Sequence, residues 1–141
     1  MERSNVDVDD FLALPSSPPA LSQLDALIRE ELAGLERVLW EGPMWGGTEQ
    51  RIIGYGAISQ PRPKGEAVDW FLVGLAAQSR HLSIYVNAAG EGGYLVQSWA
   101  SELGDVKVGA AAITFKDPSR LHEEALRRLL RRARELAPDA R

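Results

Sequence analysis

The side chains best suited to metal chemistry are three aspartates close to the N-terminus, Asp7, Asp9 and Asp10. Asp7 and Asp10 are three residues apart, so on a helix they share one face. Carboxylate oxygens are the ligands that hard divalent cations prefer, so this pattern predicts a weak metal site on the surface. The alternative is that these acids form a solvated helix surface, as Asp25 is expected to do by pairing with Arg29 four residues later.

Groups that enzymes commonly use are few in this chain. The two histidines, His81 at the mouth of a hairpin and His122 in the first turn of the last helix, stand in no metal-binding spacing and are expected at the surface. No GxSxG, P-loop or GxGxxG motif is present. The chain has no cysteine, which excludes disulfides, thiolate zinc sites and iron–sulfur ligation by its own residues. The sequence predicts a protein that is not an enzyme.

Aromatic residues give a second candidate site, for a small ligand. Strand alternation places Phe71, Val73 and Leu75 on the core face of the predicted sheet. The next strand adds Leu82, Ile84 and Val86 to that core face. On the opposite face the same alternation places Trp70, Leu72, Gly74, His81, Ser83 and Tyr85.

The strand at 51–59 adds either Tyr55 or its glycines to the aromatic face, and Met44 and Trp45 follow on a glycine-rich turn. Aromatic side chains beside glycines can form a shallow ligand surface. The candidate ligand-binding residues are Trp45, Tyr55, Trp70, His81 and Tyr85. The alternative is that these aromatic side chains pack under a loop or a helix.

The elements that must position these residues follow from periodicity and from glycine and proline positions. Helices are expected at 8–14, 19–33, 94–103 and from about 119 to 136, and strands at 37–40, 51–59, 68–76, 80–87 and 106–115. Strands grouped between helices predict an α+β fold with two layers, in which an antiparallel sheet of about five strands is backed by helices. The 141 residues are expected to form a single domain, 1–141, with a few disordered residues at each end.

Charge is unevenly distributed along the chain. The net charge is −4, yet residues 1–49 carry ten acids and three arginines, whereas residues 118–141 carry seven arginines and four acids. The acidic balance argues against nucleic-acid binding. The arginines of the last helix, Arg127, Arg128, Arg131, Arg132 and Arg134, are expected to form a solvated face. The alternative is that they contact a partner or the acidic N-terminal helix.

Targeting and membrane signals are also absent from the sequence. The acidic start is unlike a signal peptide, and no apolar run approaches the roughly 20 residues needed to span a bilayer. The sequence therefore predicts a cytoplasmic protein with no membrane association.

Six segments together resemble one bacterial family, the YdhG-like domain family. They are VDDFLALP at 8–15, GPM at 42–44, IIGYG at 52–56, WFLVGLA at 70–76, LSIYV at 82–86 and ITFKD at 113–117. The resemblance implies an α+β fold related in shape to frataxin. One branch of the family is described as a frataxin-like intracellular iron chaperone, which implies weakly bound iron and iron–sulfur or haem assembly proteins as partners.

The chain departs from the family pattern at two basic segments. Many members carry an Arg-Lys pair in the hairpin turn where this chain has Gln78 and Ser79, and a lysine-rich segment of which only Lys107 is kept. An anionic ligand bound by those groups in other members should bind weakly here or not at all. The resemblance thus predicts an iron-binding adaptor. The alternatives from the residues are a small-ligand-binding module that uses the Trp70 and Tyr85 face, or a structural or protein-interaction domain.

Overall fold

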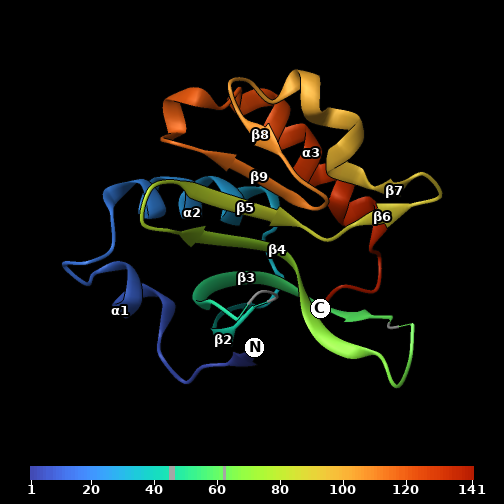
Figure 1. The fold of residues 1–141 in the computed structure, drawn as a ribbon, viewed down its shortest axis with the longest axis horizontal. Coiled ribbons are helices and arrows are strands. Elements are labelled where there is room, and N and C mark those ends of the chain that lie inside the picture. The colour runs from blue at the N-terminus through green and yellow to red at the C-terminus, as the bar shows by residue number, and fades with distance from the viewer. Residues whose placement is uncertain (45–46, 62) are drawn as a thin grey trace.

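The computed structural model describes residues 1–44, 47–61 and 63–141, and its main feature is one antiparallel sheet with helices against it (Figure 1). The helices are α1 (Val8–Leu12), α2 (Pro19–Glu31), α3 (Glu123–Leu136) and the 3₁₀ helices η1 (Leu95–Glu102) and η2 (Pro118–Arg120). The strands are β1 (Glu2–Arg3), β2 (Arg37–Pro43), β3 (Glu49–Gln60), β4 (Val68–Ala77), β5 (Leu82–Val86), β6 (Ala89–Gly90), β7 (Gly93–Tyr94), β8 (Lys107–Val108) and β9 (Ala112–Phe115).

The large sheet contains seven described strands, in the order β1-β2-β3-β4-β5-β9-β8, and its neighbours all pair antiparallel. The predicted α+β class is confirmed, but the expected count of about five strands is too low. The two further strands, β1 and β8, are two residues long, too short to show an alternating pattern. A turn closed by a 2.8 Å hydrogen bond from Gly109 N–H to the Ala112 carbonyl divides the expected strand 106–115 into β8 and β9.

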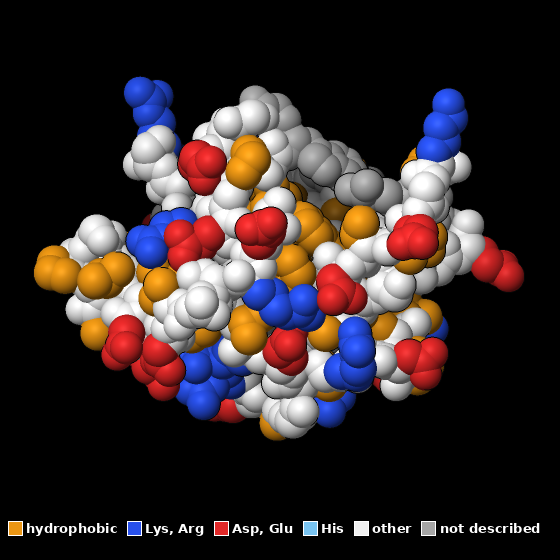
Figure 2. Space-filling model, turned by 90° about the horizontal axis from the view of Figure 1, so that it is seen from below, with side chains coloured by type: hydrophobic (Ala, Val, Ile, Leu, Met, Phe, Trp, Pro, Cys, Tyr) orange, Lys and Arg blue, Asp and Glu red, His pale blue; other side chains and the backbone are white. Residues whose placement is uncertain are grey.

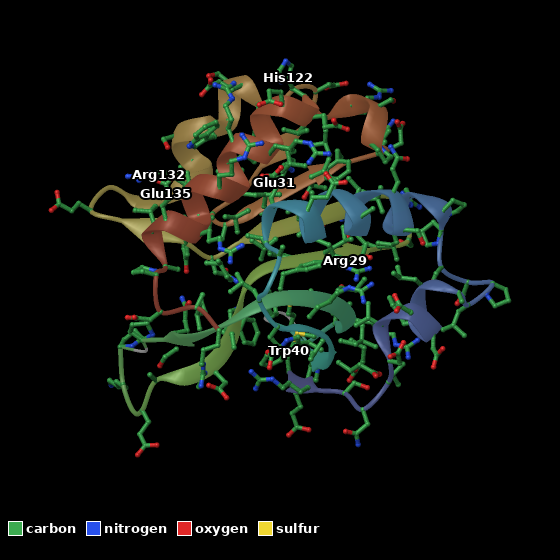
Figure 3. The ribbon with its side chains drawn as sticks, turned by 180° about the vertical axis from the view of Figure 1, so that it is seen from behind. Arg29, Glu31, Trp40, His122, Arg132 and Glu135 are labelled. Atoms are coloured by element: carbon green, nitrogen blue, oxygen red, sulfur yellow. The ribbon has the colours of Figure 1, made fainter. Side chains whose placement is uncertain are left out.

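Helices α2 and α3 lie side by side against one face of the sheet (Figure 3). Their apolar residues and the inward side chains of the strands form the main core, which includes Ile28, Leu129, Ile53, Val73 and Ile84. None of the helices in the described part of the chain has the length and apolar character of a membrane span.

Two arginines of α3 bind the acidic end of α2. Arg131 Nε lies 2.7 Å from Glu31 Oε1, and Arg127 Nη1 lies 2.7 Å from Glu30 Oε2 and 2.9 Å from Glu31 Oε2. The hydrogen bond from Arg131 lowers the pKa of Glu31, although burial acts in the opposite direction. The prediction of a purely solvated arginine face is therefore wrong at these two positions. At these two positions the arginines instead contact acids of the N-terminal third of the chain, on α2 and not on the short helix α1.

The alternation of side chains between the two faces of the sheet is interrupted, and thereby inverted, once in β3 and once in β4, at positions that lie beside each other. The predicted faces of some residues are therefore wrong. On β3, the successive N–H groups of Gly56 and Ala57 point to the same side, towards the carbonyls of Glu36 and Arg141. On β4, the successive carbonyls of Phe71 and Leu72 both accept from Asn87, from its side chain (2.9 Å) and from its backbone N–H (2.8 Å).

Because both strands shift together, the register of the β3–β4 pair is the same on either side of these positions. Gly56 permits the shift, since it adopts a left-handed φ of +80°. The shift places Leu72 in the main core and Phe71 on the opposite face, the reverse of the prediction.

Candidate functional site

The aromatic face is a second, smaller core on the sheet side opposite α2 and α3. Trp70 stacks on Phe71 with ring centroids 4.7 Å apart, and Trp40 lies 5.6 Å from each of them. Trp40 and Phe71 are only 3% and 1% exposed, whereas Trp70 and Tyr85 are half-buried at its edge. The alternative of packed aromatic side chains therefore describes most of this face.

Two glycines make this packing possible. A Cβ atom on Gly54 would lie 2.6 Å from Trp40 Nε1, and one on Gly74 would lie 2.7 Å from Phe71 Cε2. Trp40 Nε1 is buried and has no hydrogen-bond partner among the described residues. Seen from below, hydrophobic side chains gather in a central hollow bordered by charged side chains (Figure 2).

Polar groups at the edge of this second core satisfy one another. Gln78 Nε2 donates to Gln50 Oε1 (3.1 Å) and to the Tyr85 hydroxyl (3.2 Å), and Ser83 Oγ donates to Gln78 Oε1 (2.9 Å). His81 lies in the β4–β5 turn, where its carbonyl accepts from Gln78 N–H (2.9 Å). The structure thus brings Trp70 and Tyr85 to one face, with their nearby polar groups already paired.

Tyr55 is separated from these residues, because its side chain lies under α2 on the other side of the sheet. Its hydroxyl donates to Asp25 Oδ1 at 2.7 Å, and Arg37 donates to both oxygens of the same carboxylate, at 3.0 and 2.8 Å. Burial raises the pKa of Tyr55 well above its usual value, and the negative charge of Asp25 raises it further. Arg37 is therefore the main partner of Asp25, while the expected partner Arg29 stands 4.0 Å away.

The three N-terminal aspartates do not converge on one point. Asp7 caps α1 by accepting from Asp10 N–H (3.1 Å), and Asp9 Oδ1 accepts from Arg37 Nη2 (3.0 Å). Within the described residues, no group of three metal-ligating side chains comes together. The remaining candidate, Trp45, lies outside the described residues.

A groove of about 590 Å³, which the sequence did not reveal, lies where the end of β3 meets the segment after α3. We call it the C-terminal groove. It is lined by Ala57, Ile58, Ser59, Gln60, Pro61, Leu72, Asn87, Ala88, Ala89 and residues 136–141. Most of these side chains are small or apolar, and the charges of the lining are those of Asp139 and Arg141. Such residues carry no motif, so only their arrangement in space identifies the site.

The last residue closes one end of the C-terminal groove by pairing with β3. Ala57 N–H donates to the Arg141 carbonyl and Arg141 N–H donates to the Ala57 carbonyl, both at 3.0 Å. Glu36 N–H donates to the same Arg141 carbonyl, also at 3.0 Å. The expectation of a disordered end is therefore wrong here, because the backbone of Arg141 extends the ladder of the sheet.

Polar side chains that could orient a ligand stand at the other walls of this groove. Asn87 Nδ2 donates a hydrogen bond to the Phe71 carbonyl (2.9 Å), and Gln60 Nε2 lies 3.4 Å from the Tyr94 hydroxyl. The side chains of Asn87 and Gln60 line the groove, and each has further hydrogen-bond donors and acceptors that these contacts do not use. The arrangement can hold a neutral, partly apolar molecule.

Comparisons with known proteins add no family to this description. No family model matches the chain, and no curated protein or solved structure matches it. The geometry of the described residues therefore carries the functional proposal.

Proposed function

We propose that this protein is a non-enzymatic binding module whose ligand site is the C-terminal groove. The observation that carries the proposal is the groove itself, since its volume of about 590 Å³ falls in the usual range of small-molecule sites. Its walls are mostly apolar, with the amides of Gln60 and Asn87 and the hydroxyl of Ser59 as polar groups. Few polar groups on an apolar wall fix the orientation of a ligand while burial supplies the affinity.

The chemistry of the lining favours binding over catalysis. Its polar side chains are mainly amides and a hydroxyl, which accept and donate hydrogen bonds without changing charge. Proton transfer in catalysis uses titratable groups positioned near a substrate. The charged residues of this lining, Asp139 and Arg141, are both exposed, so their charges are screened by solvent.

A dye titration tests this proposal. N-phenyl-1-naphthylamine, an uncharged apolar dye, is expected to bind saturably, with increased fluorescence, and to shift the backbone amide signals of Ser59, Asn87 and Ala137 in two-dimensional NMR spectra. Ala89→Phe, an exposed position of the lining, should fill part of the groove and weaken dye binding at least tenfold. Ala100→Phe, exposed on η1, is the matched control and should bind as the wild type does. Equal binding by both variants, or shifts confined to other residues, would refute the proposal.

The expectations from the family resemblance stand beside this proposal as separate predictions. They are a two-layer YdhG-like domain of frataxin-like shape, a cytoplasmic location, weakly bound iron, and iron–sulfur or haem assembly proteins as partners. They rest on the sequence segments that resemble the family. An anaerobic ferrous titration by calorimetry tests the iron-handling role directly.

A further inference from the structure

The inversion on β3 leaves an unused strand edge inside the C-terminal groove. After the inversion, the N–H and carbonyl of Ala57 point away from β4 and bond to Arg141. Backbone groups of a strand repeat their direction every two residues, so those of Ser59 point the same way. On that side β2 is the neighbouring strand, and it begins at Arg37, opposite Tyr55. The described strands therefore supply no partner opposite Ser59.

Arg141 shows what this edge binds. Its reciprocal 3.0 Å hydrogen bonds with Ala57 are those of one antiparallel rung, made by a backbone that comes from outside the sheet. The next rung along the same edge belongs to Ser59, which is exposed and lines the groove. In Figure 1 the C-terminus reaches the β3–β4 pair at this place. The edge thus already holds one extended residue and offers a donor and an acceptor for the next.

We propose that the ligand of the C-terminal groove is an extended peptide segment of a partner protein, which pairs with β3 at Ser59. This inference rests on the proposed function, because both use the same groove. The free edge spans Ser59 to Pro61, so about three residues of the partner pair with it at roughly 3.3 Å each. Main-chain hydrogen bonds supply part of the affinity in this mode of recognition, and pockets for alternate side chains supply the specificity.

The lining defines the chemistry of that segment. Ile58, Leu72 and Leu136 offer apolar surface, and the alanines beside them leave room for branched side chains. The charges of Asp139 and Arg141 are exposed and opposite in sign, so they cancel, and the apolar walls of the groove disfavour a charged peptide segment. The partner segment is therefore a neutral strand with β-branched residues at alternate positions.

The test uses the blocked peptide acetyl-Thr-Val-Thr-Val-Thr-amide, with a version N-methylated at the central threonine as its matched control. The free peptide should shift the Ser59 amide signal downfield and slow its hydrogen exchange, and the methylated one should bind at least fivefold more weakly. Ser59→Pro removes the edge N–H at a position where proline is tolerated, because that N–H does not pair with β4. It should weaken the peptide about tenfold, whereas Ser59→Ala should leave the affinity unchanged.

The dye separates this inference from the proposed function. If the dye binds the groove but the peptide leaves Ser59 unchanged, or if both Ser59 variants bind the peptide equally, the strand-pairing inference is wrong and the binding module remains. If neither probe binds, both are wrong. Thermal unfolding of Ser59→Pro and the dye affinity of this variant show whether its fold and groove are intact. Loss of peptide affinity with dye affinity retained is the result that we expect.

Discussion

Replacing Asp25 by asparagine should lower the free energy of unfolding more than the same replacement of any exposed aspartate. The carboxylate is 3% exposed and accepts three hydrogen bonds, two from Arg37 and one from the Tyr55 hydroxyl. Asparagine has nearly the same shape but turns one acceptor into a donor that faces other donors. It also leaves the half-buried guanidinium of Arg37 without its main counter-charge.

The expected cost follows from what remains around Arg37. Removing one partner of a buried pair typically costs about 3–5 kcal/mol, and Asp9 stays on Arg37 Nη2 at 3.0 Å, which favours the lower end. We therefore expect a loss of about 3 kcal/mol, or a fall in Tm of about 10 °C for a chain of this size. Urea denaturation followed by tryptophan fluorescence measures it.

Asp9→Asn is the matched control, because Asp9 binds the same nitrogen of Arg37 but its side chain is 71% exposed. That variant should lose less than about 1 kcal/mol. A double-mutant cycle with Tyr55→Phe should show a coupling of about 1–2 kcal/mol, since both groups share Asp25 Oδ1. Equal costs for Asp9→Asn and Asp25→Asn would refute the reasoning that burial decides the value of this cluster.

Three further predictions concern other parts of the molecule. Burial raises the pKa of Tyr55, so above about pH 10 the folded state keeps a proton that the unfolded chain releases. The free energy of unfolding should therefore fall as the pH rises above about 10, and it should fall less steeply in Tyr55→Phe. Urea denaturation midpoints measured across that pH range test this prediction. Gly54→Ala should cost about 1–3 kcal/mol and alter the near-ultraviolet circular dichroism, because its methyl group would meet Trp40 and Phe71, whereas Gly92→Ala, with open space around it, should cost nearly nothing. In the ferrous titration, replacing all three N-terminal aspartates by asparagine should leave the heat of binding unchanged, because Asp7 already accepts from Asp10 N–H and Asp9 from Arg37. If the wild type binds iron saturably and this variant does not, the predicted iron site at these aspartates is favoured instead.

Part of the sheet was predictable, because the short strand β5 alternates regularly. Leu82, Ile84 and Val86 face the main core as expected from their period of two. The faces of Phe71 and Leu72 were not predictable, because their exchange depends on hydrogen bonds to Asn87, in the segment that follows β5. Periodicity within one strand contains no information about such a bond.

The candidate sites depend on contacts between distant residues as well. Trp70 and Tyr85 both border the second core, but regular alternation does not explain this, because the inversion lies between Trp70 and Gly74, the partner of Tyr85. The place of Tyr55 under α2 depends on the distant Asp25. The C-terminal groove could not be predicted from the sequence, because it forms only when Arg141 pairs with Ala57, 84 positions earlier in the chain. Its alanines and polar side chains have no spacing typical of a site.

Asp69 also receives contacts from both ends of the described chain. Its oxygens lie 3.1 Å from Arg3 Nη1 and 3.8 Å from Arg141 Nη2. Such contacts have high contact order, and proteins dominated by non-local strand pairing fold in milliseconds to seconds because long loops must close first. A circular permutant that joins residues 141 and 1 by a short linker and opens within the exposed segment 63–67 would keep the contacts of Asp69 non-local. It would also place β3 and β4, which now follow one another along the chain, at opposite ends of the sequence. We expect such a permutant to keep the fold and to reach it more slowly.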